Sequence, residues 1–129
     1  MDVPSWILAA ILRVETDSAL NGNEVVPGRV KRGRDGERGA TQIRLAAFRD
    51  VAKPNESFTR LDYDHNFSLD ISKRYLIKLY RRFGDWDIAI MAYNAGANNY
   101  TAGAKYLLRV KNAQKQNAIP RPKKSEKNS

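Results

Sequence analysis

The sequence contains no cysteine and a single histidine, His65. The absence of cysteine excludes disulfide bonds, thiolate catalysis and cysteine-ligated metal sites. One histidine without a second His or a Cys makes a poor zinc site, so we expect no metal and no cofactor. The glycines nowhere have the spacing of a Walker or Rossmann fingerprint, which disfavours nucleotide binding. Strand-rich regions and internal repeats are also missing, so a mainly α fold is expected.

The length and the charge of the chain narrow its class. A chain of 129 residues is long enough for one compact domain and too short for two ordinary ones. It carries 23 Lys and Arg against 14 acids, a formal net charge of +9. A positive protein of this kind favours an anionic partner: nucleic acid, a membrane surface or an acidic polymer such as a bacterial cell wall. Charge alone does not choose among them.

No targeting or membrane segment is indicated near the beginning of the chain. The first apolar run is interrupted by Arg13 and Glu15, and no basic stretch precedes it. It therefore matches neither a signal peptide nor a membrane span. We expect the chain as written to stay inside the cell that makes it, unless a leader has been trimmed.

Apolar residues at spacings of three and four predict five helices joined by polar loops. The expected ranges are residues 4–16, 40–51, 71–83, 86–94 and 102–114, with Gly84 ending the third and Asp85 capping the fourth. Residues 17–39 are rich in glycine and charge, and predict an irregular stretch with at most a small hairpin around residues 24–30. We expect one domain over residues 1–114 and a basic, disordered tail over 115–129.

Glu15 is the most informative residue in these predicted helices. On a helix it shares a face with Ile7, Leu8 and Ile11, so it should be drawn toward the core. Removal from water disfavours the charged form of a carboxylate and raises its pKa, which makes a proton donor near neutral pH. The alternative is a solvated residue or an ion-pair partner for Arg13.

A second informative segment, residues 91–96, reads Met-Ala-Tyr-Asn-Ala-Gly at the end of a predicted helix. The phenol of Tyr93 offers a flat face for a pyranose ring and a hydroxyl for hydrogen bonding, and the amide of Asn94 can both donate and accept. The alternative is a helix C-terminus packed by Tyr93 and turned by Asn94 and Gly96.

Three segments in order carry a family resemblance: Glu-Thr-Asp-Ser at 15–18, Gly-Glu-Arg-Gly-Ala-Thr-Gln-Ile at 36–43, and Ala-Tyr-Asn-Ala-Gly at 92–96. This order resembles the soluble lytic transglycosylase and goose-type lysozyme family, which cleaves bacterial peptidoglycan. The likeness runs from about Trp6 to Val110, and the third motif matches at all five positions. It implies a lysozyme-like α+β domain of about five or six helices around a substrate cleft.

The resemblance also implies roles for individual residues. Glu15 matches the catalytic acid, Gln42 the glutamine that lines the cleft, and Tyr93 the tyrosine that orients the acid and the substrate. Residues 106–110 are similar to a later Tyr-Val-x-x-Val helix of the family. The remaining substrate-binding candidates are Thr16, Asn94 and Tyr106.

Three departures from the family pattern affect what we expect. Thr16 stands where the family usually has Ser, which keeps a hydroxyl and adds a methyl group. Ala40 and Thr41 replace the usual Leu-Met pair, and we expect them to make a smaller, more polar contact under the sugar. Arg44 occupies the place where goose-type lysozymes carry an acid, so one candidate for a water-activating base is missing. A reaction that needs only one carboxylate is therefore favoured.

The function we expect is cleavage of the β-1,4 bond between N-acetylmuramic acid and N-acetylglucosamine, with Glu15 as acid and then base and a 1,6-anhydromuramic end as product. The first alternative is a hydrolytic lysozyme that uses Asp35 or Glu37 as its second carboxylate. The second is a basic nucleic-acid-binding module, which leaves the sugar motifs unexplained. The third is a wall-binding remnant without turnover.

We expect a monomer that acts on bacterial peptidoglycan in the cell envelope and does not bind nucleic acid. The basic tail is expected to dock on anionic components of the envelope. The missing signal segment suits a phage-type enzyme, and a trimmed bacterial enzyme fits as well.

Overall fold

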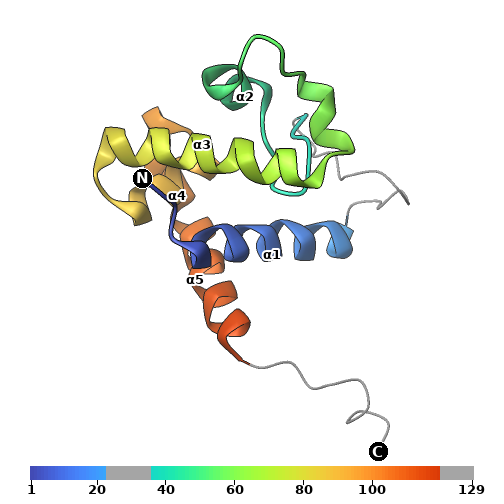
Figure 1. Cartoon of the computed structure of the whole chain (residues 1–129). Coiled ribbons are helices and arrows are strands. Elements are labelled where there is room, and N and C mark those ends of the chain that lie inside the picture. Colours follow the sequence, from blue (N-terminus) through green and yellow to red (C-terminus); the bar gives the residue numbers. More distant parts are fainter. Residues whose placement is uncertain (23–35, 120–129) are drawn as a thin grey trace, which may run out of the picture.

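A computed structural model describes residues 1–22 and 36–119 of the chain, and these ranges form a helical domain (Figure 1). The prediction of a mainly α fold is confirmed. Within the described ranges there is no strand, and one isolated antiparallel bridge joins Arg38 to Ile43. The elements are α1 (Ser5–Gly22), α2 (Leu45–Val51), the 3-10 helix η1 (Phe58–Asp62), α3 (His65–Phe83), α4 (Trp86–Ala95), the 3-10 helix η2 (Ala97–Gly103) and α5 (Ala104–Ala118).

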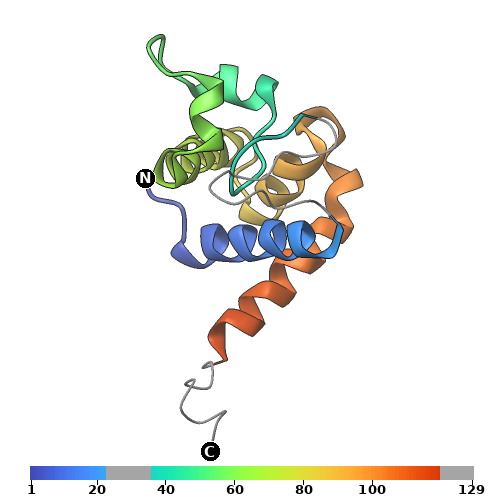
Figure 2. The ribbon, with the colours of Figure 1, turned by 90° about the vertical axis from the view of Figure 1, so that its right-hand side faces the viewer.

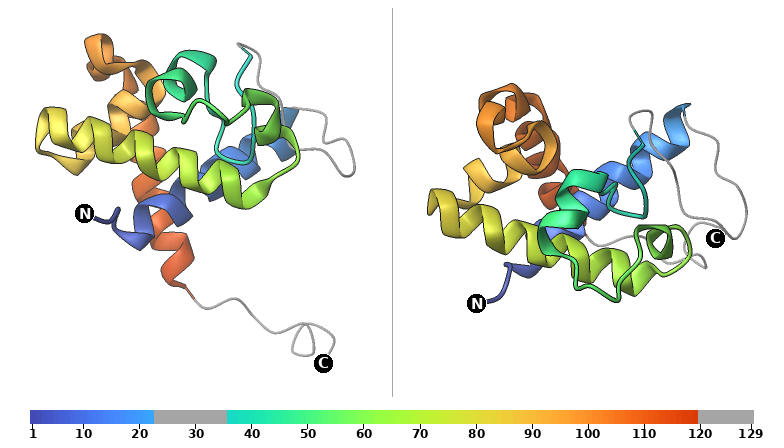
Figure 3. Two further views of the ribbon diagram at one scale, coloured as in Figure 1. Left: turned by 45° about the horizontal axis from the view of Figure 1, so that its top comes forward. Right: turned by 90° about the horizontal axis from the view of Figure 1, so that it is seen from above.

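Helix α3 is the central element of the domain, because it contacts α1, α2, α4 and η1. Helix α5 crosses α1 and also packs on α4 (Figures 2 and 3). In Figure 1, α2 and the C-terminal end of α5 lie at opposite ends of the molecule. The core between these helices is made of fully buried aliphatic side chains, among them Ile7, Ile11, Ile71, Leu76, Ile90 and Val110. None of the described helices combines the length and apolar content that a membrane span requires.

Helix α1 has the predicted apolar face but is longer than predicted. Ile7 and Ile11 are fully buried, and Leu8 packs against the edge of the core. The helix continues to Gly22, so the prediction that the irregular stretch begins at residue 17 is wrong. Residues 17–21 contain neither glycine nor proline, and nothing in them interrupts a helix before Gly22. The hairpin expected around residues 24–30 lies outside the described residues.

Helix α2 is shorter than predicted, because it begins at Leu45 and not at residue 40. The preceding residues cannot be helical: Gln42 has a left-handed φ of +55°, and Arg44 is extended. The helix is anchored by Phe48, whose ring lies 5.5 Å from that of Phe58 and 6.1 Å from that of Phe67.

Helices α3 and α4 follow the sequence signals most closely. Gly84 ends α3 in a left-handed conformation, and the side chain of Asp85 caps α4 by accepting from Ile88 N–H at 3.0 Å, both as predicted. Helix α3 begins six residues before the predicted start. The missed signal is Asp64, whose carboxylate accepts from Phe67 N–H at 3.0 Å as an N-cap.

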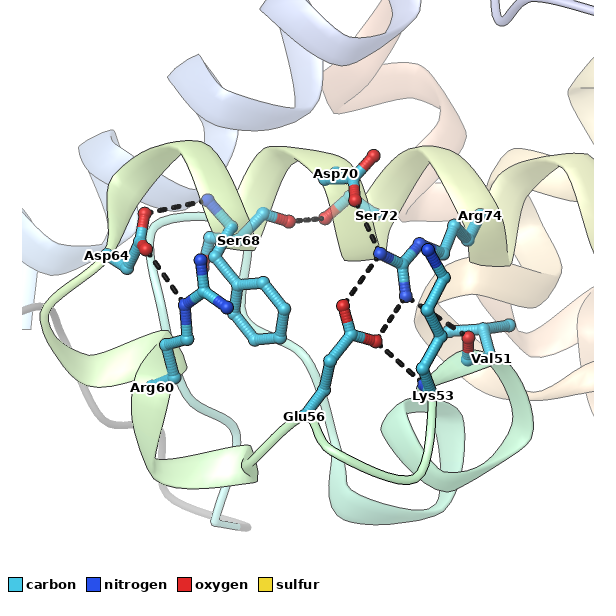
Figure 4. Close-up of polar contacts among 10 residues, drawn as sticks. Val51, Lys53, Glu56, Arg60, Asp64, Ser68, Asp70, Ser72 and Arg74 are labelled. Carbon is cyan, nitrogen blue, oxygen red and sulfur yellow. Dashed lines mark hydrogen bonds and ion pairs between the residues drawn. The ribbon is translucent and has the colours of Figure 1, made fainter.

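Ion pairs hold the loop between α2 and η1 against α3. Arg74 on α3 holds the loop before η1 by a bidentate pair with Glu56, at 2.5 and 2.9 Å, and also binds Asp70 at 2.6 Å (Figure 4).

Helix α5 runs to Ala118, four residues beyond its predicted end, because its last turn lacks a helix breaker and Pro120 restricts Ile119 to extended backbone.

Candidate active site

The second motif forms a tight turn immediately before α2. Arg38 and Ile43 exchange two backbone hydrogen bonds of 2.8 Å, which close a loop over residues 39–42. Inside the loop, Gly39 carbonyl accepts from the backbone N–H of Gln42 at 3.0 Å and from its side-chain Nε2 at 2.8 Å. The side chain of Gln42 is therefore folded over its own turn, and its position depends on Gly39.

Gly39 is required at this position for two physical reasons. Its φ is +90°, a conformation that side chains disfavour. A Cβ on Gly39 would also collide with Ser68 Oγ on α3 and lie 3.2 Å from the carbonyl oxygen of Leu61. The turn thus rests directly on α3, and the second glycine of the motif permits that contact.

Buried hydroxyls connect this turn to α3 and α4. The phenol of Tyr93 on α4 donates to Thr41 carbonyl at 2.8 Å, and its oxygen lies 3.0 Å from Ser72 Oγ on α3. Thr41 Oγ1 lies 2.5 Å from the same Ser72 Oγ. Thr41 and Ser72 are fully buried. The expectation that Thr41 makes a polar contact under the sugar is therefore wrong, because its side chain faces the core.

A cavity of about 130 Å³ brings the second and third motifs together. Gln42 and Arg44 come from the turn, and Tyr93 and Gly96 come from the end of α4. The cavity is lined by Gln42, Ile43, Arg44, Ala46, Ala47, Tyr75, Tyr93 and Gly96.

Glu15, on α1, lies within electrostatic reach of two buried phenols. Burial is the main cause that raises the pKa of Tyr93, and the negative charge of Glu15 raises it further. The pKa of Tyr106 on α5 is raised by the same two causes in the same order. Glu15 is half-buried. The charge of this one carboxylate therefore acts on phenols from two other helices, α4 and α5.

Tyr106 has a further property in this region. Its hydroxyl is buried and has no hydrogen-bond partner among the described residues. A buried hydroxyl left in this state is unusual, because burial without a partner costs free energy. The hydrogen-bonding capacity of the Tyr106 hydroxyl is therefore unused within the described residues.

The other described candidates do not line this cavity. Thr16 is exposed, and its hydroxyl donates to Leu12 carbonyl one turn earlier at 2.7 Å. Asn94 is exposed in the last turn of α4. Glu37 is half-buried just before the turn, and Asp35 lies outside the described residues.

Sequence reasoning missed Ser72 and the inward orientation of Thr41. A signal for Ser72 was present, since Ser68 and Ser72 interrupt the apolar face of α3 at helical spacing. Among residues 1–22 and 36–119, no group of three His, Asp or Glu side chains is arranged to hold a metal ion.

Comparison with known proteins identifies the family to which the chain belongs. The profile of the transglycosylase SLT domain matches residues 2–119, a range that includes Glu15 and all three motifs. No curated protein and no solved structure matched the chain. Because the matched range covers most of the sequence, the chain belongs to the transglycosylase SLT domain family, the enzymes that act on the bacterial cell wall as peptidoglycan lytic transglycosylases.

Proposed function

We propose that this enzyme cleaves the β-1,4 bond between N-acetylmuramic acid and N-acetylglucosamine with Glu15 as its only acid and base. The proposal is supported by the match of residues 2–119 to the transglycosylase SLT domain and by the half-buried position of Glu15, whose charge raises the pKa values of the buried phenols Tyr93 and Tyr106. A half-buried carboxylate whose charge acts on buried phenols is suited to general acid catalysis.

The proposed reaction needs no water and no second carboxylate. Protonated Glu15 gives its proton to the glycosidic oxygen as the bond from C1 of muramic acid breaks. The acetamido oxygen of the same sugar stabilises the positive charge at C1. The Glu15 carboxylate then takes the proton of the 6-hydroxyl while that oxygen bonds to C1. A 1,6-anhydro ring forms, the N-acetylglucosamine hydroxyl leaves, and Glu15 is protonated again.

The cavity beside the turn supports the proposed substrate-binding roles. Gln42 and the ring of Tyr93 border the cavity of about 130 Å³, which we assign to a small substituent of the sugar such as an N-acetyl group. Arg44, at the same cavity, suits an anionic polymer. Asn94, Tyr106 and Thr16 are the further substrate contacts that we propose.

The test is Glu15→Gln, which keeps the size of the side chain and removes the transferable proton. Loss of wall lysis with unchanged circular dichroism is expected, and wall clearance at the parent rate would refute the assignment. Glu37→Gln is the matched control, because Glu37 is also half-buried and has no role in the proposed reaction.

Product analysis separates the proposed reaction from the hydrolytic alternative. Mass spectrometry of digested peptidoglycan should show anhydro ends. Reducing ends would indicate a lysozyme, and loss of those products in Glu37→Gln or in Asp35→Asn would identify the second carboxylate.

The basic end of the chain is proposed to dock on the anionic envelope. Residues 119–129 contain Arg121, Lys123, Lys124 and Lys127 against one acid, Glu126. Truncation after Ala118 leaves α5 complete, and it should slow lysis of intact cells more than digestion of isolated wall. Equal effects on both substrates would contradict docking.

A further inference from the structure

The backbone of Gln42 is the most unusual local feature of the site. Its φ of +55° makes it the one non-glycine residue with a positive φ in the described ranges. A side chain disfavours this conformation, so it persists only where the surroundings hold it in place.

We propose that the hydroxyls of Thr41, Ser72 and Tyr93 form a closed ring of hydrogen bonds that fixes the peptide before Gln42, which makes Thr41 and Ser72 positioning residues of the active site. This proposal rests on the function proposed above for its kinetic test, and a separate measurement tests the ring itself.

The three hydroxyl protons can serve the three contacts in only one direction. The Tyr93 phenol donates to Thr41 carbonyl, at 2.8 Å. The contact of 3.0 Å between Ser72 and Tyr93 must then use the Ser72 proton. The contact of 2.5 Å between Thr41 and Ser72 is left with the Thr41 proton. The chain of donors begins at the side chain of Thr41 and returns to its own carbonyl.

An alternative acceptor does not serve all the contacts. Ser68 carbonyl lies 3.0 Å from Ser72 Oγ and 3.4 Å from Thr41 Oγ1. A Ser72 proton directed at that carbonyl leaves the contact between Ser72 and Tyr93 without a hydrogen. Each member of the ring is buried, so a missing hydrogen bond there is not replaced by water.

The ring acts on Gln42 through one peptide group. Tyr93 binds the carbonyl of Thr41, and Gly39 carbonyl binds the N–H of Gln42 on the other side of the same peptide. The orientation of this peptide sets φ of Gln42, and Gln42 borders the cavity of the site. The hydroxyl of Tyr93 thus holds the turn, while its ring borders the cavity.

The kinetic test uses Thr41→Val, which keeps the shape of the side chain and removes its hydroxyl, with Thr41→Ser as the matched variant that restores it. We expect Thr41→Val to lower kcat/KM by about tenfold, the effect of one buried hydrogen bond. Thr41→Ser should recover most of the loss. Ser68→Ala is the control outside the ring, because its buried hydroxyl has no partner among the described residues, and it should leave kcat/KM unchanged.

A double-mutant cycle separates a ring from three independent contacts. Thr41→Val combined with Tyr93→Phe should lower kcat/KM little more than the worse single variant, because either change opens the same ring. Additive losses would overturn the proposal, and so would an unchanged kcat/KM in Thr41→Val or no recovery in Thr41→Ser. Should Thr41→Val fail to fold, Ser72→Ala replaces it in the cycle.

Nuclear magnetic resonance of the free protein tests the ring without activity. The Cα shift of Gln42 and its coupling between the amide and α protons report a left-handed φ. We expect this signature in the parent, its retention in Thr41→Ser and Ser68→Ala, and its loss in Thr41→Val. Retention in Thr41→Val overturns the ring. A parent protein that keeps this signature but releases no wall fragments overturns the proposed function alone.

Discussion

Gly39→Ala is the substitution whose effect the structure defines most sharply. The new methyl group meets Ser68 Oγ and lies 3.2 Å from Leu61 carbonyl oxygen, on a backbone with φ of +90°. The positive φ costs about 1–2 kcal/mol for a residue with a Cβ. Overpacking against α3 adds about 1–3 kcal/mol. The free energy of unfolding should therefore fall by about 2–5 kcal/mol.

Gly84→Ala is the matched control for the backbone contribution. Gly84 also has a positive φ, of +67°, and no described atom lies within 4 Å of its Cβ position. It should lose only the backbone contribution of about 1–2 kcal/mol. Equilibrium unfolding in urea measures both changes, and the difference between them isolates the packing of the turn on α3.

A second substitution tests which atom causes the collision. Ser68→Ala removes the nearest atom, and alone it should be close to neutral because that hydroxyl has no partner in the described part of the chain. Added to Gly39→Ala, it should restore part of the lost free energy of unfolding. The reasoning is refuted if Gly39→Ala costs no more than Gly84→Ala, or if Ser68→Ala restores nothing.

Two further predictions concern ionisable groups. The hydrogen bond from Arg74 lowers the pKa of Glu56 from 4.5 to about 2, so the pair stabilises the fold fully above pH 4.5 and loses its contribution as the pH falls toward 2. Because solvent screens the pair, we expect it to contribute about 1 kcal/mol to the free energy of unfolding. Unfolding of Glu56→Gln and of the parent, each at pH 7 and pH 3, measures this contribution. The prediction is contradicted if both proteins show the same change in the free energy of unfolding between the two pH values. Tyr106→Phe should hold or raise the free energy of unfolding, by up to about 1 kcal/mol, because it removes an unpartnered buried hydroxyl. A loss of activity in this stable variant would assign the hydroxyl to the reaction, and a loss of stability would contradict the absence of a partner.

The sequence predicted the elements whose signals are local. The apolar stripe of α3, its end at Gly84 and the cap at Asp85 depend on neighbouring residues, and all three were found in the structure. The start of α2 was not predictable in this way. Its apolar spacing extends back to residue 40, but the backbone there is fixed by Ser72 and Tyr93, which lie 31 and 52 residues from Thr41 in the sequence.

The arrangement of the candidate site likewise depends on contacts between residues far apart in the sequence. Helical periodicity predicted that Glu15 faces inward, and it is half-buried. Periodicity within α1 does not indicate which side chains of other helices lie near that face, because Tyr93 and Tyr106 belong to α4 and α5. The resemblance in the three motifs supplied the match of Glu15 with Tyr93, whose pKa the charge of Glu15 raises in the structure.

Thr41 shows how a departure from a family pattern can be compensated within one chain. An apolar residue at this position would leave Ser72 and Tyr93 in the core with one hydrogen-bond donor fewer, which disfavours burial of their hydroxyls. Burial of the Thr41 hydroxyl is therefore favourable only together with Ser72, the serine that interrupts the apolar face of α3 and accepts its hydrogen bond. The polar character of Thr41 supports the geometry of the turn from inside the core, and the proposed contact with a sugar is left to Gln42 and Tyr93, which line the cavity.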